Sequence, residues 1–161
     1  MSGGPGRTVW RLTTARHAGR AFDGEGARLY GGRWNHPGTP LVYTSATLSL
    51  AALELVVHFQ QETLPDDLVA IRARLPPGLR VGRLDRSLLP EDWRRHPAPE
   101  ALKDLGSAWQ RSGRSAPLEV PSALIPQESN VLLNPIHRAI QKLEIDPPEP
   151  FSFDSRMWKG P

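Results

Sequence analysis

The run from Leu48 to Val57, LSLAALELVV, contains a single charged residue, Glu54. Ten residues are too few to cross a bilayer, which needs about 20, so the run predicts a helix packed inside a folded domain. On such a helix Glu54 has Leu50 and Val57 as neighbours four and three positions away. The sequence must therefore give this carboxylate an unusual place among aliphatic side chains.

Two interpretations of Glu54 follow from the helical spacing. The first places it on a narrow exposed stripe, with an intrahelical pair to His58; the stripe would run through Thr47, Glu54, His58 and Gln61. The second places it at the wall of a cleft. Burying a carboxylate is costly unless a cation pairs with it, and Arg33 or Arg11 could be that cation.

The chain of 161 residues suits one domain, with 39% apolar residues to supply a core. It contains no apolar run of about 18 residues, and its beginning lacks the apolar core of a signal peptide. We therefore expect a cytoplasmic protein that does not contact a membrane. Residues 1–8 are expected to be a flexible N-terminus, and 9–161 the single catalytic domain.

The polar composition narrows the possible chemistry. No cysteine occurs, and the five histidines are scattered without metal-ligand spacing, so we expect no metal site and no cofactor. The net charge is +3, and 17 of the 20 basic residues are arginine, which binds phosphate or carboxylate in two-point fashion. These residues are dispersed, and no helix-turn-helix signature occurs, so direct nucleic-acid binding is a minor hypothesis.

Alternating apolar residues and turn signals predict about six short strands. They are placed at 9–12, 41–44, 68–75, within 76–85, at 118–125 with an interruption at Pro121, and at 129–135. One helix is expected from a cap at Ser45 or Thr47 to about Gln60, and a second from Pro99 to a closing Gly113. Strands and helices do not alternate regularly, so we expect an α+β domain with a small mixed, mostly antiparallel sheet.

Three segments are less regular. Residues 13–30 predict an irregular stretch with one helical turn. Residues 136–146 fit a helix by their apolar spacing and a strand at their end. The proline-rich tail is expected to lie as an edge strand.

Three residues, and Ser122 as a fourth, could bind an anionic, aromatic ligand. Arg33 follows two glycines that permit close approach of a ligand, although it could equally stack on Trp34. Tyr43 could offer its ring to a heteroaromatic group, although most strand tyrosines are packing residues. Arg11 is a strand arginine with the same ambiguity.

Ser122, in VPSA, could bind a ligand or cap a bulge. It lacks the Gly-x-Ser-x-Gly context of a hydrolase nucleophile, and no phosphate-loop or dinucleotide-binding fingerprint occurs. Asn134-Pro135 with His137 reads as a structural turn.

Several short motifs occur in a recognisable order: WRL, GGRWN, LVYTS followed by ALEL, VPSA, and SNVLLNP followed by a histidine. Their order resembles that of the RES-domain toxins of bacterial RES/Xre-type toxin–antitoxin systems, a family named after an arginine, a glutamate and a serine. The resemblance runs from about Val9 to the tail, and GGRWN–VYTS–ALEL is its most specific part. The segment after His137 departs from the family in having fewer strand features.

The resemblance implies a fold similar to ADP-ribosyltransferase toxins, with NAD⁺ as substrate. It implies a toxin that degrades NAD⁺ by hydrolysis or phosphorolysis or, alternatively, one that modifies a protein with ADP-ribose. Matched by position, the catalytic residues are Arg33, Tyr43 and Glu54, and the NAD-binding residues are Arg11, Arg33, Tyr43 and Ser122. It also implies an antitoxin with an Xre-like helix-turn-helix region that covers the active-site cleft, with DNA bound only through that partner.

A non-enzymatic alternative remains at this point. In it, the chain is a binding module in which Arg33 and Glu54 form a structural pair.

Overall fold

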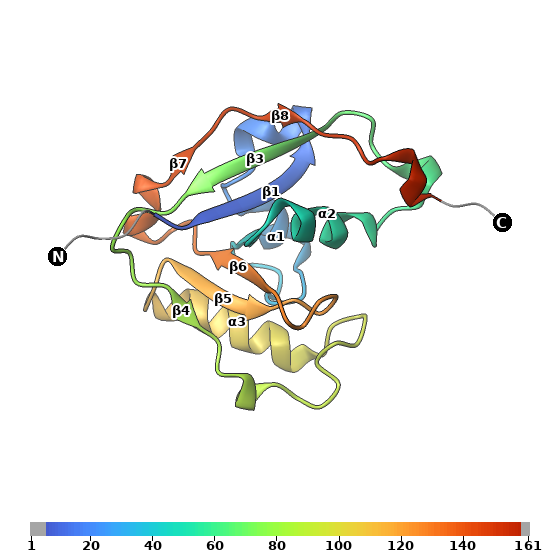
Figure 1. The fold of residues 1–161 in the computed structure, drawn as a ribbon. Helices are drawn as coiled ribbons and strands as arrows, with labels where there is room; N and C mark the ends of the chain where they lie inside the picture. Colours follow the sequence, from blue (N-terminus) through green and yellow to red (C-terminus); the bar gives the residue numbers. More distant parts are fainter. Residues whose placement is uncertain (1–5, 159–161) are drawn as a thin grey trace.

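The computed structural model describes residues 6–158, which form an α+β domain (Figure 1). The strands are β1 (Thr8–Thr14), β2 (Val42–Ser45), β3 (Leu68–Arg74), β4 (Gly82–Arg83), β5 (Pro117–Pro121), β6 (Ser129–Leu133), β7 (Glu144–Ile145) and β8 (Glu149–Pro150). The α-helices are α1 (Glu25–Tyr30), α2 (Leu48–Val56) and α3 (Glu100–Ser112). Short 3₁₀ helices occupy Ala15–Arg20, Gln61–Thr63, Arg86–Leu88, Arg138–Lys142 and Ser155–Met157. No helix of residues 6–158 has the length and hydrophobicity needed to cross a membrane.

The strands form one sheet in the order β4-β5-β6-β2-β1-β3-β7, and β8 also pairs with β3. Among the strands of residues 6–158, only the β4–β5 pair is parallel, which confirms the predicted mixed, mostly antiparallel sheet. β1 pairs with β3 along its whole length but with β2 at a single position, Trp10 opposite Ser45. The sheet therefore has two halves that diverge from one narrow junction, as Figure 1 shows.

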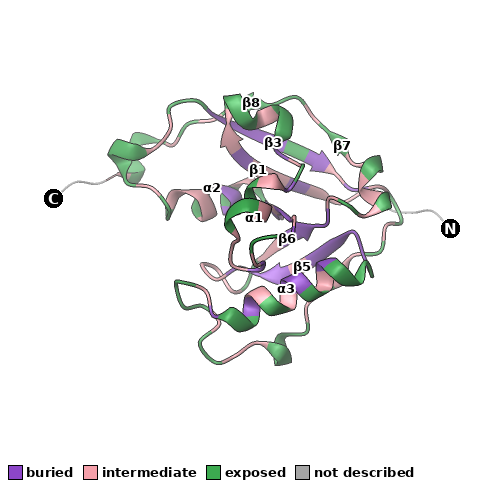
Figure 2. Cartoon of the chain, turned by 180° about the vertical axis from the view of Figure 1, so that it is seen from behind, coloured by how far each residue is buried: buried purple, intermediate pink, exposed green. Residues whose placement is uncertain are grey.

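Two hydrophobic clusters pack on the sheet, and the first of them joins its two halves. One lies between β1, β3 and β6 and contains Val9, Ala73 and Val131. The other lies beneath α3, where Trp34 and Leu102 pack against Leu132 of β6 and its neighbours. Figure 2 shows the buried face of α3 turned toward β5 and β6, with the exposed residues on its outer side.

Helix α3 approaches the loop that carries GGRWN unusually closely. A Cβ atom at Gly106 would overlap the carbonyl oxygen of Trp34 and lie 2.9 Å from Trp34 Cβ. Only a residue without a side chain allows this contact. The Trp34 side chain is 2% exposed, so the loop is fixed to the helix directly beside Arg33.

Helix α2 packs on β1 and β3, and it begins at a defined cap. The Thr47 side chain accepts a hydrogen bond from the Leu50 amide at 3.1 Å. Ala51 is buried in a cluster with Leu12 and Ala70 of β1 and β3, and Leu55 also contacts this cluster. The cap and the packed face together set the rotation of α2 about its axis.

Replacing this cap should destabilise the protein modestly. We expect Thr47→Ala to lower the free energy of unfolding by about 1 kcal/mol, because the first turn loses a side-chain acceptor. Urea denaturation monitored by circular dichroism measures the change. Ser49→Ala is the matched control, because Ser49 is exposed on the same helix and caps nothing. Equal stabilities of the two variants would contradict the assigned cap.

Several predicted boundaries were wrong. α2 ends at Val56 rather than near Gln60, because its contacts with the sheet end at Leu55 and the next amides bond three residues back. Residues 13–30 contain two short helices rather than one turn, and the second is preceded by Asp23, whose carboxylate accepts from the Glu25 amide at 2.9 Å. β5 ends at Pro121, which confirms the predicted interruption there, but the predicted continuation to 125 is wrong. Proline has no amide hydrogen to continue a ladder.

The two ends of the chain differ partly from expectation. Residues 1–5 of the predicted flexible segment lie outside the described part of the chain, but β1 already begins at Thr8, and Leu75 N–H donates to Arg7 O at 2.8 Å. The ambiguous stretch 136–146 combines both alternatives, a 3₁₀ helix followed by β7. β8 confirms the edge strand in the tail, and with β7 it explains why the described residues contain more strands than the six expected.

Candidate active site

Glu54 lies in the last turn of α2 and is partly buried. Its Oε1 accepts hydrogen bonds from Ser122 Oγ and from Asn130 Nδ2, each at 2.7 Å. These donors come from the loop after β5 and from β6, so the carboxylate joins three elements. The contacts differ from the exposed stripe with a His58 pair, and the predicted cleft beside Glu54 stays a prediction. The partners, however, are neutral donors and not the arginine expected from the sequence.

Ser122 is 0% exposed and uses its full hydrogen-bonding capacity inside the protein. Its hydroxyl donates to Glu54 and accepts from the amides of Leu124 and Ile125, both at 3.1 Å. The serine thus caps the turn that follows β5 and orients the carboxylate. Its predicted contact with substrate stays a prediction.

Arg33 extends from the GGRWN loop toward a second loop. Its Nη1 donates to the carbonyl oxygens of Trp93 at 3.1 Å and Arg95 at 3.0 Å. Burial lowers the pKa of the guanidinium from its ordinary value, and the negative charge of Glu54 opposes this shift. Arg33 is therefore oriented by backbone carbonyls and close enough to Glu54 to feel its charge. It is not stacked on Trp34, whose ring belongs to the core beneath α3.

Tyr43, on β2, anchors the loop that carries Arg33. Its hydroxyl donates to Asn35 Oδ1 at 2.6 Å and accepts from the Trp34 amide at 2.9 Å. A Cβ atom at Gly32 would lie 2.6 Å from the same hydroxyl oxygen, so the second glycine of GGRWN makes room for the tyrosine. The hydroxyl is occupied by these contacts, which leaves the partly exposed ring as the part available to a ligand.

Removing the Tyr43 hydroxyl should destabilise the protein and change its response to alkali. We expect Tyr43→Phe to lower the free energy of unfolding by about 1–2 kcal/mol, because the Trp34 amide loses its acceptor. Burial raises the pKa of Tyr43, so at alkaline pH the folded protein keeps a proton that the unfolded chain releases. The wild-type free energy of unfolding should therefore fall as the pH rises above about 10, and Tyr43→Phe should remove part of that fall.

Urea denaturation at pH 7 and at pH 10.5 measures both effects. Tyr30→Phe is the control, because Tyr30 is 84% exposed and should behave like wild type. A Tyr43→Phe variant as stable as Tyr30→Phe would contradict the anchoring role.

Arg11 fills the place where β1 and β2 diverge. Its Nη1 donates to the Tyr43 carbonyl oxygen at 2.8 Å, which gives that carbonyl the partner that a continued β1–β2 ladder would have supplied. Burial lowers the pKa of Arg11, and Asp23 opposes the shift. Its Nε is buried and has no hydrogen-bond partner among residues 6–158.

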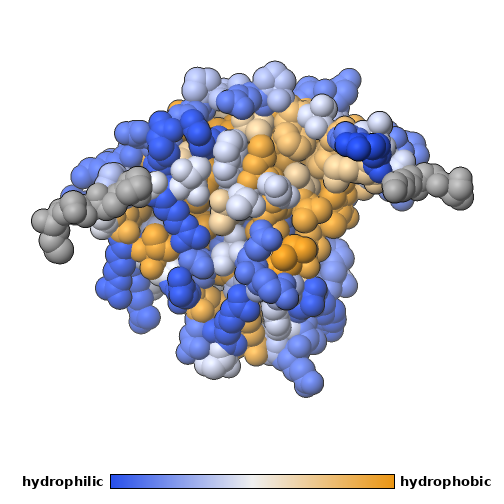
Figure 3. All heavy atoms as spheres, in the orientation of Figure 1, coloured by the Kyte–Doolittle hydropathy of each residue, from blue (hydrophilic) through white to orange (hydrophobic). Residues whose placement is uncertain are grey.

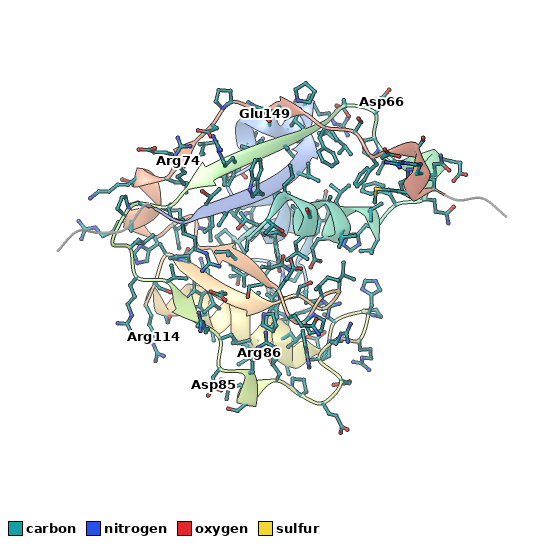
Figure 4. All side chains as sticks on the ribbon, in the orientation of Figure 1. Asp66, Arg74, Asp85, Arg86, Arg114 and Glu149 are labelled. Atoms are coloured by element: carbon teal, nitrogen blue, oxygen red, sulfur yellow. The ribbon has the colours of Figure 1, made fainter. Side chains whose placement is uncertain are left out.

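The structure thus brings all five predicted residues into one region. Ser122 donates to Glu54, whose charge acts on Arg33. The Tyr43 hydroxyl contacts the loop that carries Arg33, and Arg11 donates to the Tyr43 carbonyl oxygen. Figure 4 labels charged residues at the edges of the molecule, among them Arg74, Glu149, Asp85 and Arg114. Among residues 6–158, no group of three or more His, Cys, Asp or Glu side chains could hold a metal ion.

Three polar residues that complete the region were not predicted from the sequence. Asn130 holds Glu54, Ser45 donates to Asn130 Oδ1 at 2.7 Å, and Asn35 fixes the GGRWN loop through three backbone carbonyls. The signal for Asn130 and Ser45 was the pairing of β2 with β6, which places them directly opposite each other. That register could not be read from either strand alone.

Comparison with known proteins shows which family the chain resembles. The model of the RES domain family matches residues 8–154. The Toxin Res of Photorhabdus laumondii is 36% identical over 157 residues, which cover 94% of this chain and 97% of that protein. The Prs ADP-ribosylating toxin of Sphingobium sp. is 34% identical over 154 residues, which cover 93% of this chain and 96% of that protein.

A solved structure shares the fold. A chain of the M. tuberculosis MbcT–MbcA toxin–antitoxin complex superposes with a TM-score of 0.73 at 20% identity, covering 91% of this chain and 85% of that chain. At this identity the likeness concerns the fold alone. The family match, however, spans nearly all of the described residues, and the protein described here belongs to the RES domain family.

Proposed function

We propose that the chain is the toxin of a toxin–antitoxin pair and that it cleaves the nicotinamide–ribose bond of NAD⁺ at the site formed by Glu54 and Arg33. One observation carries the proposal. The Glu54 carboxylate is held at one oxygen by two donors, its other oxygen has no hydrogen bond from residues 6–158, and a cationic side chain lies close by. The similarity to proteins named Toxin Res and Prs ADP-ribosylating toxin supports the proposal of a toxin that uses NAD⁺.

The proposed chemistry needs one anionic group. As the C–N bond breaks, its electron pair moves to the nicotinamide ring and cancels that ring's positive charge, while positive charge develops on the ribose. The transition state resembles the oxocarbenium-like state of glycoside cleavage. The free oxygen of Glu54 would stabilise this charge or bind a ribose hydroxyl. Because the leaving group departs as a neutral molecule, no strong general acid is needed.

The other residues are assigned to binding. The guanidinium of Arg33 suits the pyrophosphate of NAD⁺, with Arg11 as a second cationic donor. The ring of Tyr43 would stack on the nicotinamide. Ser122 would act on substrate through its hold on Glu54. No metal or further cofactor enters this scheme.

The acceptor of the ADP-ribosyl group distinguishes two versions of the function. Water would give ADP-ribose and a proton, whereas inorganic phosphate would give ADP-ribose 1″-phosphate. A protein side chain would give an ADP-ribosylated protein. The similarity to the Prs ADP-ribosylating toxin supports this transfer to protein as the alternative to NAD⁺ degradation. The same pocket serves all three acceptors.

Product analysis tests the proposal and separates these versions. Purified protein is incubated with NAD⁺, with and without phosphate, and free nicotinamide and the ribosyl product are quantified by chromatography. Labelled NAD⁺ offered to a cell lysate detects transfer to protein. We expect nicotinamide release in at least one arm. If no arm yields nicotinamide or labelled protein, the enzymatic proposal is wrong.

The proposed partner is an antitoxin with an Xre-like helix-turn-helix region, which would cover the cleft and bind DNA on behalf of the complex. Support comes from the fold shared with a chain of a toxin–antitoxin complex and from the surface of α2. Leu53 precedes Glu54 on that helix, Val57 directly follows the helix, and they are 36% and 55% exposed. Figure 3 shows hydrophobic surface gathered over this part of the molecule. Size-exclusion chromatography with light scattering on a co-expressed pair would give the stoichiometry.

A further inference from the structure

We propose that Asn130, held in turn by Ser45, is a positioning residue that fixes the Glu54 carboxylate and keeps its second oxygen available to substrate. This inference rests on the proposed NAD⁺ cleavage and adds a residue to it. Asn130 is the second residue of β6, and its Nδ2 donates to Glu54 Oε1 at 2.7 Å. Ser45, directly opposite on β2, donates to Asn130 Oδ1 at 2.7 Å.

The chemistry of the amide explains why asparagine suits this place. One end of the amide is a donor and the other an acceptor. Only the NH₂ end can face the carboxylate, because the opposite orientation would bring two acceptor oxygens together. The Ser45 hydroxyl occupies the acceptor end and so favours the same orientation. The direction of the chain of hydrogen bonds, from Ser45 through Asn130 to Glu54, is therefore determined by the groups themselves.

Two donors on one oxygen define the plane of the carboxylate. Ser122 reaches Oε1 from the loop after β5, and Asn130 reaches the same atom from β6. A single donor would leave the carboxylate free to rotate about its last torsion, which has a broad, roughly two-fold preference. With both donors in place, Oε2 is presented in one direction. The predicted consequence of losing Asn130 is a misdirected Oε2, and not a loss of substrate contacts.

Asn130→Ala tests this consequence by steady-state kinetics of nicotinamide release. We expect kcat to fall about tenfold, the size of effect expected for a hydrogen bond to a charged group, while KM changes less than about twofold. Ser45→Ala should give a smaller fall in kcat, because the carboxylate alone still orients the amide. If Asn130→Ala leaves kcat unchanged or raises only KM, the positioning role is wrong.

Ser129→Ala provides a matched control from the neighbouring residue of the same strand. Ser129 Oγ also donates to a carboxylate, Glu119 Oε1 at 2.9 Å, but that carboxylate is paired with Arg7 outside the site. This variant therefore loses the same kind of contact from the same strand. We expect its kcat and KM to stay within about twofold of wild type. A general weakening of β6 would instead impair both variants.

Asn130→Asp gives a readout that a purely structural role would not change. At alkaline pH the new carboxylate cannot donate and repels Glu54, whereas a proton shared by the two carboxylates at lower pH restores a donor. The rate of Asn130→Asp relative to wild type should therefore rise as the pH falls from 8 to 5. The negative charge of Glu54 acts on Arg33, and Arg33 is the same in both proteins. A flat ratio would overturn the proposal.

A substrate-free measurement separates this inference from the proposed function. Side-chain amide signals of Asn130 in ¹⁵N NMR spectra report its contact with Glu54 whether or not NAD⁺ is cleaved. Glu54→Ala should shift these signals, whereas Ser129→Ala should not. If wild type releases no nicotinamide but Glu54→Ala shifts the Asn130 side-chain signals, the proposed function is wrong and the contact of Asn130 with Glu54 stands. If wild type releases nicotinamide but Glu54→Ala does not shift the Asn130 side-chain signals, the positioning role is wrong and the proposed function stands.

Discussion

Glu54→Gln should reduce nicotinamide release from NAD⁺ by about 10²–10³-fold, the size of effect seen when one group that stabilises transition-state charge is removed. Glutamine keeps the shape of the side chain and an oxygen that can accept from Ser122 and Asn130. The variant should therefore fold like wild type but lack the negative charge near the ribose. Initial rates at saturating NAD⁺ measure the loss, and thermal melts check the fold.

Two comparisons sharpen this experiment. Glu62→Gln removes an exposed carboxylate outside the site and should leave the rate unchanged. Glu54→Ala should be inactive as well, but also less stable by about 1–3 kcal/mol, because the Ser122 hydroxyl and the Asn130 amide lose their acceptor.

The results also decide between an enzyme and a binding module. A structural role for Arg33 and Glu54 predicts that Arg33→Ala and Glu54→Ala unfold the domain, rather than leaving it folded but inactive. A folded, inactive Glu54→Gln protein supports the enzymatic role. A fully active Glu54→Gln protein would contradict the role assigned to the carboxylate.

Gly106→Ala should cost about 3 kcal/mol of stability and lower the melting temperature by roughly 5–10 °C. Helix propensity alone predicts the opposite, a gain of up to about 1 kcal/mol for alanine in the middle of a helix. The close contact with Trp34 reverses the sign, because the new methyl group meets a backbone carbonyl rather than the end of a flexible side chain. Thermal and urea denaturation measure the change.

Gly26→Ala is the matched control for this prediction. Gly26 lies in α1, and a Cβ atom there would meet nothing within 4 Å, so alanine should leave the stability unchanged or raise it slightly. A Gly106→Ala protein as stable as Gly26→Ala would show that α3 and the GGRWN loop separate easily. Because Trp34 is adjacent to Arg33, the same displacement should also lower activity at temperatures where the variant is folded.

Local sequence patterns predicted most of the elements but not all of their ends. Apolar alternation located β1, β2, β3 and β6. The cap at Thr47 gave the start of α2, and Gly113 gave the end of α3. The end of α2 was missed because it depends on where contact with the sheet stops. β7 and β8 are two residues long, and their pairing with β3 depends on a chain reversal that periodicity does not encode.

The residues of the candidate site also fall into those that the sequence predicted and those that it did not. Glu54 was identifiable because one charge in an apolar run is unusual, and Arg33 because two glycines precede it. The occupation of the Tyr43 hydroxyl by Asn35 and the Trp34 amide was not readable, because it requires the fold of the intervening loop. Asn130 carried no local signal, since its importance comes from strand register and from a helix far away in the sequence.

The two carbonyls that hold Arg33 have an entropic consequence. A free arginine side chain carries about 2 kcal/mol of rotamer entropy, which a ligand must otherwise overcome when it immobilises the guanidinium. Here the carbonyls of Trp93 and Arg95 fix Nη1 before any ligand arrives. The ordering of Arg33 thus occurs during folding, and an anion that binds the remaining donors meets a cation whose direction is already set.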